Sequence, residues 1–577
     1  MSSLSRFLAA GLLALLPSAV LAQGSAQPEA ATGRHAGGQT FARQQLAVTA
    51  NPHASQAALA ILREGGSAVD AAIAAQMVLN VVEPQSSGIG GGGFLLAYDA
   101  AHRRIDAYDG RETAPAALRP DVFLDDQGQS RPFREMVASG RSVGVPGVVA
   151  MLAQAHREHG KLPWRRLFAP AIALAEAGFA VSPRLAQLLA RDPDLRQGAG
   201  ARALFYHPDG TALAPGETLR NPALAATLRR VAEEGPSAFY RGEIARAMVA
   251  AVAAHHRPGA LSEADLAAYQ PIKRAALCGP YRSYRICGMP PPSSGGTTVL
   301  ATLGILSRFD LAQVRPEAGT LRAFFTHLFA EAGRLAYADR DRYLADPAFA
   351  DVPAAALVEP AYLAQRSAAI RFDQSGGKAE PGTPRGPRLR GAADAALERP
   401  STSHLSIVDR WGNAVSFTTS IEDAFGSRIL VGGFLLNNQL TDFSFRPEGV
   451  NAPAPGKRPR SSMAPTLVFD PQHRLVAVLG SPGGSRIPNY VSQALVGLLD
   501  WRMSPAEVAA QPHVGSRNGA TELEAGTDVE RARHFLEALG HPVSVGDMTS
   551  GLHLIQKVPG GLLGAADPRR EGAAAGD

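Results

Sequence analysis

The sequence predicts an α+β protein with a helix-rich first half and a strand-rich last third. Between residues 145 and 270, Ala, Leu and Arg recur in a helical pattern that Pro and Gly interrupt. From Thr402 onward, short apolar runs of strand type alternate with turn residues. The chain has 577 residues, 45% of them hydrophobic, which is enough for a large core.

The N-terminus has the pattern of an export signal. An early Arg precedes an apolar run from Phe7, and Val20-Leu21-Ala22 supplies small residues at the positions that signal peptidase reads. We therefore expect residues 1–22 to be a signal peptide and the mature protein to be soluble and exported, either periplasmic or secreted. A retained membrane anchor is the alternative. The polar residues 23–45 are expected to be a flexible segment.

Two helices and a strand are expected next. Ala57, Leu59, Ile61 and Leu62 give one apolar face that ends at Gly65-Gly66, and a second helix covers 69–82. Four glycines, 90–93, then precede a strand at 94–98. A nucleotide-binding loop would need a following helix and a Lys-Ser/Thr pair, so we interpret the glycines as a close backbone crossing.

The cysteines are Cys278 and Cys287, in a stretch that alternates like a strand or hairpin. In an oxidising compartment they could form a disulfide, and two free buried thiols remain the alternative. Their spacing is not the C-x-x-C of a redox-catalytic pair. A Pro-rich loop then leads into an apolar helix, and residues 324–347 continue with a helical pattern.

The strand-rich part follows the clearest linker of the chain, residues 374–398, which is rich in Gly, Pro and Arg. Residues 402–408 and 414–421 read as two strands joined by a turn at 409–413. Further strands are expected in "GGFLLNN", "APTLVFD" and "RLVAVLG", and a helix from about Asn489 to Asp500.

Charge and composition exclude some function classes. The net charge of +5 is spread along the chain without a dense Lys/Arg block, which disfavours a nucleic-acid site. We discern no metal-ligand cluster among the 15 histidines, so we expect neither a metal nor a cofactor. His404 is interpreted as a structural strand residue.

Thr402 has the position of a hidden N-terminus, after a linker and at the start of a core strand. A hydroxyl is a weak nucleophile that needs a nearby base. A free α-amino group has a pKa of about 7.7–8.0 and can serve as that base near neutral pH. Cleavage before Thr402 would place nucleophile and base on one residue. A plain β-hairpin with a polar start is the structural alternative.

Other polar groups lie at predicted strand ends. Asn437, Asn438, Gln439 and Asp442 follow one strand, Ser461-Ser462 precede another, and Gly483-Gly484 precede a helix, where backbone N–H groups can face an anion. Each of these has an ordinary structural interpretation when it is taken alone.

Together these segments resemble the γ-glutamyltransferase (glutathione hydrolase) family over nearly the whole mature chain. The matching segments, in family order, are "GGSAVDAAIAAQMVLNVVEPQSSGIGGGGFLL", "DGRETAP", "GVPG", "MPPPSSGG", "AYADRDRYLADP", "TSHLSIVDRWGNAV", "LLNNQLTDFS", "RPRSSMAPT" and "GSPGGSRI". The resemblance implies an αββα sandwich of the N-terminal nucleophile hydrolase type. It also implies self-cleavage between Ser401 and Thr402 into a large subunit, 46–401, with its linker at about 374–401, and a small catalytic subunit, 402–577, that remain together as a heterodimer.

The resemblance also implies roles for individual residues. Thr402 would be the nucleophile, Ser420 its supporting hydroxyl, and Gly483 and Gly484 the oxyanion hole. The remaining residues would bind the substrate: Arg111, Ser461 and Ser462 its α-carboxylate, and Gln439 and Asp442 its α-ammonium. The expected donors are glutathione and related γ-glutamyl compounds, and the acceptors are water, amino acids or peptides.

Two departures from the family pattern affect specificity. Glu422 stands where the family usually has Asn, and a second carboxylate beside Asp442 favours a cation there. The alternative is that Glu422 points away and pairs with an arginine such as Arg428. The segment 443–460 is shorter than in many members, which implies a more open site.

These departures keep two alternative functions open. A glutaryl-type cephalosporin acylase on the same fold is the first, although the two carboxylates argue against a substrate without an ammonium. A non-catalytic exported relative is the second. Such a relative would be expected to lose Thr402 or the glycine pair, and this chain has both.

Overall fold

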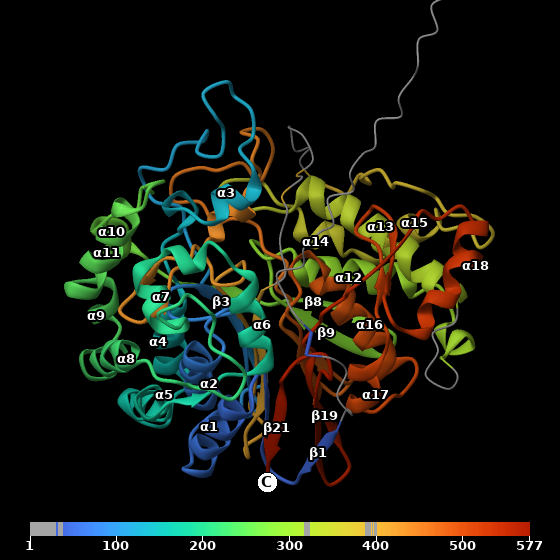
Figure 1. The fold of residues 1–577 in the computed structure, drawn as a ribbon. Coiled ribbons are helices and arrows are strands. Elements are labelled where there is room, and N and C mark those ends of the chain that lie inside the picture. The colour runs from blue at the N-terminus through green and yellow to red at the C-terminus, as the bar shows by residue number, and fades with distance from the viewer. Residues whose placement is uncertain (1–30, 33–37, 317–322, 387–393, 395, 397–400) are drawn as a thin grey trace, which may run out of the picture.

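The computed structural model describes residues 31–32, 38–316, 323–386, 394, 396 and 401–577 (Figure 1). The predicted signal peptide, residues 1–22, lies outside the described residues. Within the described ranges, no helix has the length and apolar character needed to cross a membrane.

Two seven-stranded sheets form the centre of the described structure. The first sheet has the order β21 (Ala573–Gly576), β2 (Leu46–Thr49), β10 (Ser403–Val408), β11 (Ala414–Ser420), β3 (Gly92–Asp99), β4 (Arg104–Asp109) and β7 (Ile272–Ala275). The second has the order β1 (Gln39–Ala42), β20 (Gly561–Ala566), β19 (His553–Val558), β15 (Leu475–Gly480), β14 (Thr466–Phe469), β9 (Tyr284–Gly288) and β8 (Leu277–Tyr281). Every pairing within these two sheets is antiparallel.

The sheets pack face to face because their strands bury both faces. In β3, Phe94, Leu96 and Tyr98 belong to the core between the sheets, whereas Leu95 and Ala97 belong to the core between the first sheet and its helices. This alternation follows from the two-residue period of a strand. The resulting αββα layering agrees with the fold class that the sequence predicts.

Helices cover the outer face of each sheet (Figure 1). Those on the first sheet are α1 (Pro52–Arg63), α2 (Ala68–Val82), α4 (Val148–His159), α5 (Ala169–Ala177), α6 (Pro183–Arg191), α7 (Ala199–Phe205), α8 (Pro222–Glu234), α9 (Ser237–Tyr240), α10 (Glu243–Ala254) and α11 (Glu263–Ala268). Those on the second are α12 (Gly295–Leu306), α13 (Ala323–Tyr343), α14 (Ala354–Leu357), α15 (Pro360–Ser367), α16 (Ile487–Leu499), α17 (Pro505–Ala510) and α18 (Arg533–Ala538).

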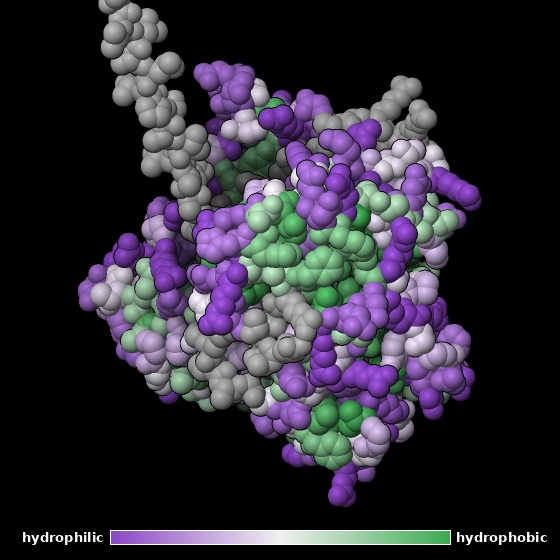
Figure 2. All heavy atoms as spheres, turned by 90° about the vertical axis from the view of Figure 1, so that its right-hand side faces the viewer, coloured by the Kyte–Doolittle hydropathy of each residue, from purple (hydrophilic) through white to green (hydrophobic). Residues whose placement is uncertain are grey.

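Smaller elements complete the described chain. Helix α3 (Phe133–Val137) belongs to a third, small apolar cluster. The short strands are β5 (Phe179–Ala180), β6 (Thr218–Leu219), β12 (Leu430–Val431), β13 (Phe434–Leu435), β16 (Val514–Gly515), β17 (Thr521–Glu524) and β18 (Val543–Gly546). Figure 2 shows that the outer face of the second helix layer carries apolar side chains framed by hydrophilic ones.

The glycine-rich loop is a close backbone crossing, as the sequence predicts. A Cβ atom on Gly90 would lie 2.1 Å from the carbonyl oxygen of Leu435, and one on Gly91 would lie 2.1 Å from the carbonyl oxygen of Ser420. Only glycine fits such approaches. The loop therefore brings the beginning of β3 against the end of β11.

The prediction that residues 23–45 form a flexible segment is wrong at its C-terminal end. Residues 39–42 form β1, which pairs with β20 at the edge of the second sheet. Four residues give little strand signal on their own, and the pairing depends on backbone hydrogen bonds to a neighbour more than 500 residues away in sequence. Cys278 and Cys287 face each other on the hairpin β8–β9 and are joined by a disulfide.

The proposed cleavage point lies at the start of β10, deep in the molecule. Strands β10 and β11 lie between β2 and β3, so residues from both sides of the Ser401–Thr402 bond alternate within the first sheet. In the second sheet, β14 similarly pairs with β9. The elements before and after this bond are therefore interleaved, and Thr402 lies at the edge of a rigid strand.

Candidate active site

Thr402 and Ser420 enclose the peptide bond that precedes Thr402. The register of β10 on β11 pairs Ser403 with Thr419, which places Ser420 opposite Thr402. The Thr402 hydroxyl donates to the Ser401 carbonyl oxygen at 2.6 Å, and the Ser420 hydroxyl donates to the same oxygen at 2.7 Å. Two hydroxyls thus polarise this carbonyl, and Thr402 Oγ1 lies beside it.

Two further backbone contacts fix this bond. The Ser401 hydroxyl donates to the Gln85 carbonyl at 2.8 Å, and the guanidinium of Arg570 donates to the Thr402 carbonyl at 3.0 Å. Arg570 is buried, which lowers its pKa to about 9. Arg570 lies near the C-terminus, and no sequence motif indicated its place at this site.

The predicted oxyanion-hole glycines precede α16. Gly483 and Gly484 have φ values of 137° and 55°, in the region that favours glycine. A Cβ atom on Gly483 would lie 2.5 Å from the ring of Tyr490, so a side chain is excluded on steric grounds as well. Gly484 lines the same pocket as Thr402 and Ser420.

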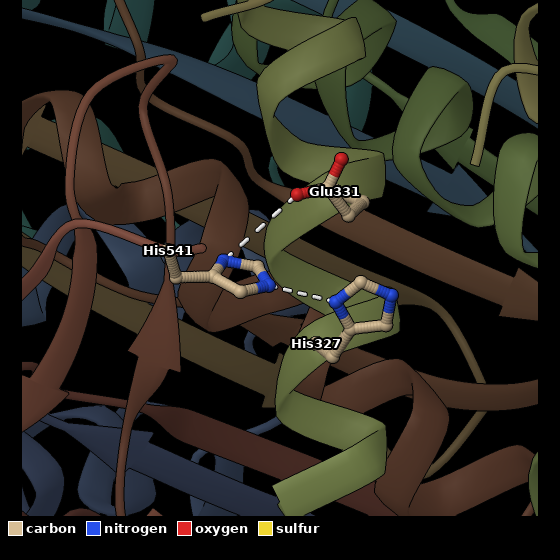
Figure 3. A group of neighbouring side chains, drawn as sticks. All are labelled: His327, Glu331 and His541. Carbon is tan, nitrogen blue, oxygen red and sulfur yellow. Dashed lines mark hydrogen bonds and ion pairs between the residues drawn. The ribbon is translucent and has the colours of Figure 1, made fainter. Parts of the chain in front are cut away.

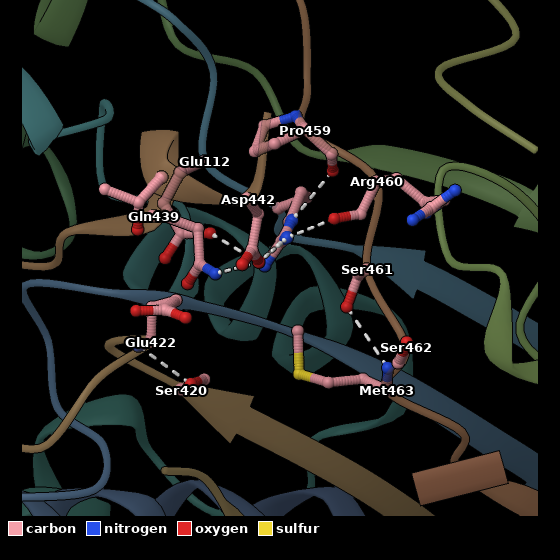
Figure 4. A network of polar contacts seen from close by, with 12 residues as sticks. Glu112, Ser420, Glu422, Gln439, Asp442, Pro459, Arg460, Ser461, Ser462 and Met463 are labelled. Atoms are coloured by element: carbon pink, nitrogen blue, oxygen red, sulfur yellow. Dashed lines mark hydrogen bonds and ion pairs between the residues drawn. The ribbon is translucent and has the colours of Figure 1, made fainter. Parts of the chain in front are cut away.

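Arg111 and Asp442 form the charged end of this pocket. Figure 4 shows Asp442 beside Gln439 in this network of polar contacts. An Nη2 hydrogen of Arg111 is donated to Asp442 Oδ2 at 2.6 Å, and Gln439 Nε2 donates to the same oxygen at 2.7 Å. The guanidinium also donates to the backbone carbonyls of Pro459 and Arg460 at 3.1 and 2.7 Å. These buried contacts fix the plane of the guanidinium.

Glu422 lies in the pocket and not against Arg428. Asn438 donates to the Glu422 carboxylate, and the backbone N–H of Glu422 donates to the Ser420 hydroxyl at 2.9 Å. Arg428 instead pairs with Asp192 at 2.9 Å and Asp423 at 3.3 Å. The alternative that Glu422 pairs with Arg428 is therefore wrong. The φ of 80° at Glu422 turns the chain sharply after β11.

Glu112 is a site residue that the sequence analysis did not identify. Its side chain is fully buried 3.8 Å from Arg111, and desolvation raises its pKa to about 8. Neither carboxyl oxygen has a hydrogen-bond partner among the described residues. The only sequence feature that could have indicated Glu112 is its position next to Arg111 in "DGRETAP".

Ser461 and Ser462 line the pocket beside Thr402. The backbone N–H of Met463 donates to the Ser461 hydroxyl at 3.1 Å, and Arg340 Nη2 donates to the Ser462 hydroxyl at 2.7 Å. Arg340 comes from α13, on the second helix layer, and it was also not identified from the sequence. It adds a second buried cation near the predicted carboxylate subsite.

The pocket is a small, partly open cavity in the uncleaved chain. Arg111 and Asp442 pair with each other at its charged end. The more open site expected from the short segment 443–460 stays a prediction.

His327, Glu331 and His541 form the one fully buried group of possible metal ligands found among the described residues (Figure 3). Hydrogen bonds and an ion pair with Arg334 explain the positions of these three side chains without a metal ion. The Nδ1 of His327 lies 2.7 Å from the Nε2 of His541, whose Nδ1 lies 3.0 Å from Arg334 Nη1. Arg334 also pairs with Glu331. The guanidinium of Arg334 already supplies a positive charge beside Glu331 and His541. These side chains are therefore a poor fit for a metal ion.

His404 is enclosed by its own sheet. Its ring nitrogens lie 2.9 Å from the Thr418 hydroxyl and 3.1 Å from the Ser406 hydroxyl. Burial lowers its pKa well below the usual value. This environment holds the ring neutral and away from Thr402 Oγ1, in agreement with its interpretation as a structural residue.

Comparison with known proteins identifies relatives over almost the full length. The family model described as Gamma-glutamyltranspeptidase matches residues 54–577. The chain is 36% identical to "Glutathione hydrolase proenzyme" of Bacillus subtilis (strain 168), covering 92% of this chain and 91% of the relative. It is also 36% identical to "Acylase ACY 1 proenzyme" of Pseudomonas sp. (strain SE83), with 91% and 92% covered. The solved cephalosporin acylase from Bacillus halodurans superposes with a TM-score of 0.82 at 28% identity, covering 94% and 97%.

Proposed function

Because this chain belongs to the gamma-glutamyltranspeptidase family, we propose that it is a self-cleaving γ-glutamyltransferase and glutathione hydrolase with Thr402 as its nucleophile. The observation that carries the proposal is the placement of Thr402 Oγ1 and Ser420 Oγ on the carbonyl of Ser401, in the pocket that holds Arg111 and Asp442. One hydroxyl can thus serve both cleavage and acyl transfer.

Self-cleavage begins with attack of Thr402 Oγ1 on the Ser401 carbonyl carbon. The C–N bond breaks, the nitrogen takes a proton, and Ser401 becomes an ester on Oγ1. Water then hydrolyses the ester, which releases the Ser401 carboxylate and leaves Thr402 with a free hydroxyl and α-amino group. The hydrogen bond from Ser420 to the same carbonyl supports stabilisation of the developing oxyanion.

Substitution of the nucleophile tests this step. The Thr402→Ala chain is expected to stay as one polypeptide on a denaturing gel, whereas Thr402→Ser, which keeps the hydroxyl, is expected to cleave. If Thr402→Ala still yields a new N-terminus at residue 402, the assignment of the nucleophile fails.

The charged end of the pocket supports recognition of an amino acid. A γ-glutamyl donor carries its α-carboxylate and α-ammonium on one carbon, so their partners must be adjacent. Arg111 and Asp442 lie 2.6 Å apart, and Gln439 Oε1 is a buried acceptor without a hydrogen-bond partner among the described residues. Glu422 adds a second carboxylate in the pocket, and it favours a cation.

Transfer repeats the chemistry of cleavage on an external amide. Thr402 Oγ1 attacks the γ-carbonyl, and the α-amino group of Thr402 takes the hydroxyl proton. The C–N bond then breaks as the same proton passes to the amine, which leaves. Gly483 and Gly484 would donate their N–H groups to the oxyanion. The γ-glutamyl ester is then resolved by water or by the amine of an amino acid or peptide.

A glutaryl-type acylase is the second candidate, and the similarity to acylases in sequence and fold favours it. Two matched anilides, γ-glutamyl and glutaryl, separate the candidates because they differ only in the α-amino group. Faster amine release from the γ-glutamyl compound would support the proposal. Faster release from the glutaryl compound would reverse the order of the two candidates.

The interleaved sheets support a lasting heterodimer of the 46–401 and 402–577 subunits. The disulfide supports folding in an oxidising compartment, and with it export and removal of residues 1–22. N-terminal sequencing of the mature large chain is expected to begin at Gln23, because the segment 23–45 precedes its 46–401 region. A sequence beginning upstream of residue 22 would reject this cleavage site.

A further inference from the structure

Asp394 is a buried carboxylate on the chain that leads to the cleavage bond, eight residues before Thr402. Its side chain is 1% exposed, and its Oδ2 lies 2.7 Å from Arg460 Nη2. Asn451 Nδ2 donates to the same oxygen at 3.0 Å. The backbone N–H of Asp394 donates to the Asp341 carbonyl at 2.9 Å. Three separate segments of the folded protein therefore hold this one residue.

The partners of Asp394 continue into the active site. The backbone carbonyl of Arg460 accepts from Arg111, and the next residue is Ser461. The Nδ2 of Asn451 also donates to the Asp442 carbonyl at 2.8 Å, and its Oδ1 accepts from the Arg460 N–H at 2.9 Å. Asp394 is thus connected to the pair Arg111 and Asp442 through Arg460 and Asn451.

We propose that Asp394 is a positioning residue for self-cleavage, which anchors the chain on Arg460 and Asn451 so that the Ser401 carbonyl is held toward the hydroxyls of Thr402 and Ser420. This inference rests on the proposed function, because it concerns the same bond. From Asp394 to Ser401 the chain spans at most about 25 Å, so a fixed Asp394 restricts the volume that Ser401 can occupy.

The physical basis is the cost of holding reacting groups together. Without the anchor, the stretch of chain before Ser401 that is free to move becomes longer, and each doubling of such a stretch lowers the population of the reactive geometry roughly threefold. Loss of orientation adds to this, since small displacements of reacting atoms cost rate. The negative charge of Asp394 is needed as well. The side chain of Arg460 is only 1% exposed, and a neutral residue at position 394 would remove this ion-pair partner.

The test measures cleavage of freshly purified full-length precursor over time on a denaturing gel. Asp394→Asn and Asp394→Ala are expected to cleave about three- to tenfold more slowly than the parent. Asp394→Glu, which restores the carboxylate, is expected to recover much of the rate. Asp373→Asn is the matched control, because Asp373 is 75% exposed and pairs with Arg371 at the surface.

A second measurement separates positioning from folding. After cleavage is complete, kcat and KM of the Asp394→Asn enzyme for a γ-glutamyl anilide are expected to match those of the parent, since Thr402 and Arg111 are unchanged. Cleavage at the parental rate would overturn the proposal. Slow cleavage together with an equal loss of kcat in the cleaved enzyme would also overturn it, because the defect would then be one of folding. Failure of the proposed function is a different result, namely cleavage of the Thr402→Ala chain at the same bond.

Discussion

At the scale of single residues, Arg111 carries the clearest prediction. It is 1% exposed, and its donors are aimed at Asp442 and two backbone carbonyls. Arg111→Ala removes the cation expected to bind the substrate carboxylate and leaves Asp442 without this partner. We expect KM for a γ-glutamyl anilide to rise about 10- to 100-fold, the range for a lost charged hydrogen bond.

The control for Arg111 is an arginine of the surface. Arg119 is 79% exposed and pairs with Asp121, so Arg119→Ala is expected to leave KM unchanged. Steady-state kinetics of fully cleaved enzyme make the comparison. Equal KM values for Arg111→Ala and the parent would remove Arg111 from the binding site.

Glu112 predicts a pH dependence of stability. Burial raises its pKa from 4.5 to about 8 in the folded protein. Between these values the unfolded chain has released a proton that the folded chain keeps, so the free energy of unfolding falls as pH rises. Glu112→Gln removes this loss. The variant is expected to be more stable than the parent by up to about 1.4 kcal/mol per pH unit between pH 4.5 and the folded pKa of about 8, as measured by denaturant unfolding. Equal curves at pH 7.5 would contradict the assignment.

At the scale of elements, the hairpin β8–β9 carries the disulfide at one end of the second sheet. Closing so short a loop stabilises the folded state by about 2 to 3 kcal/mol. The double variant Cys278→Ser/Cys287→Ser is expected to unfold at a lower temperature but to keep its kcat, because neither residue lines the pocket. A loss of kcat in the folded double variant would show that the hairpin also positions the site.

The sequence predicts elements well where periodicity or turn chemistry is strong. Helix α2 and the hairpin β10–β11 match their expected positions within one or two residues. Strand β1 was missed because a short edge strand depends on a distant partner. Arg340 and Arg570 were missed for the same reason, since tertiary packing brings Arg340 to Ser462 and Arg570 to the Thr402 carbonyl. Glu112 was missed because its burial beside Arg111 is visible only in the folded chain.

At the scale of the whole molecule, buried neutral histidines predict sensitivity to acid. Burial lowers the pKa of His541 to about 3 and that of His553 to about 4, and it also lowers that of His404. Below a pH of about 6.5 the unfolded chain binds protons that the folded chain does not, so stability falls as pH falls. Each histidine contributes up to about 1.4 kcal/mol per pH unit until its folded pKa is reached.

One substitution checks this origin of acid sensitivity. His541→Gln can accept from Arg334 and donate to His327, yet it does not titrate. We expect a shallower loss of stability between pH 6.5 and 4 than in the parent, measured by denaturant unfolding at each pH. A parallel pair of curves would mean that other groups control acid unfolding.

The interleaving of strands from both sides of residue 402 changes the order of the folding reaction. The precursor folds as one molecule, so its refolding rate is independent of concentration. Once the bond is cut, neither fragment holds a complete sheet, and recovery from denaturant becomes a bimolecular encounter that dilution slows. After cleavage, therefore, the folded state is not readily regained once the protein has unfolded. The lifetime of the mature enzyme is then set by how slowly it unfolds, because reassembly of two dilute fragments is rare.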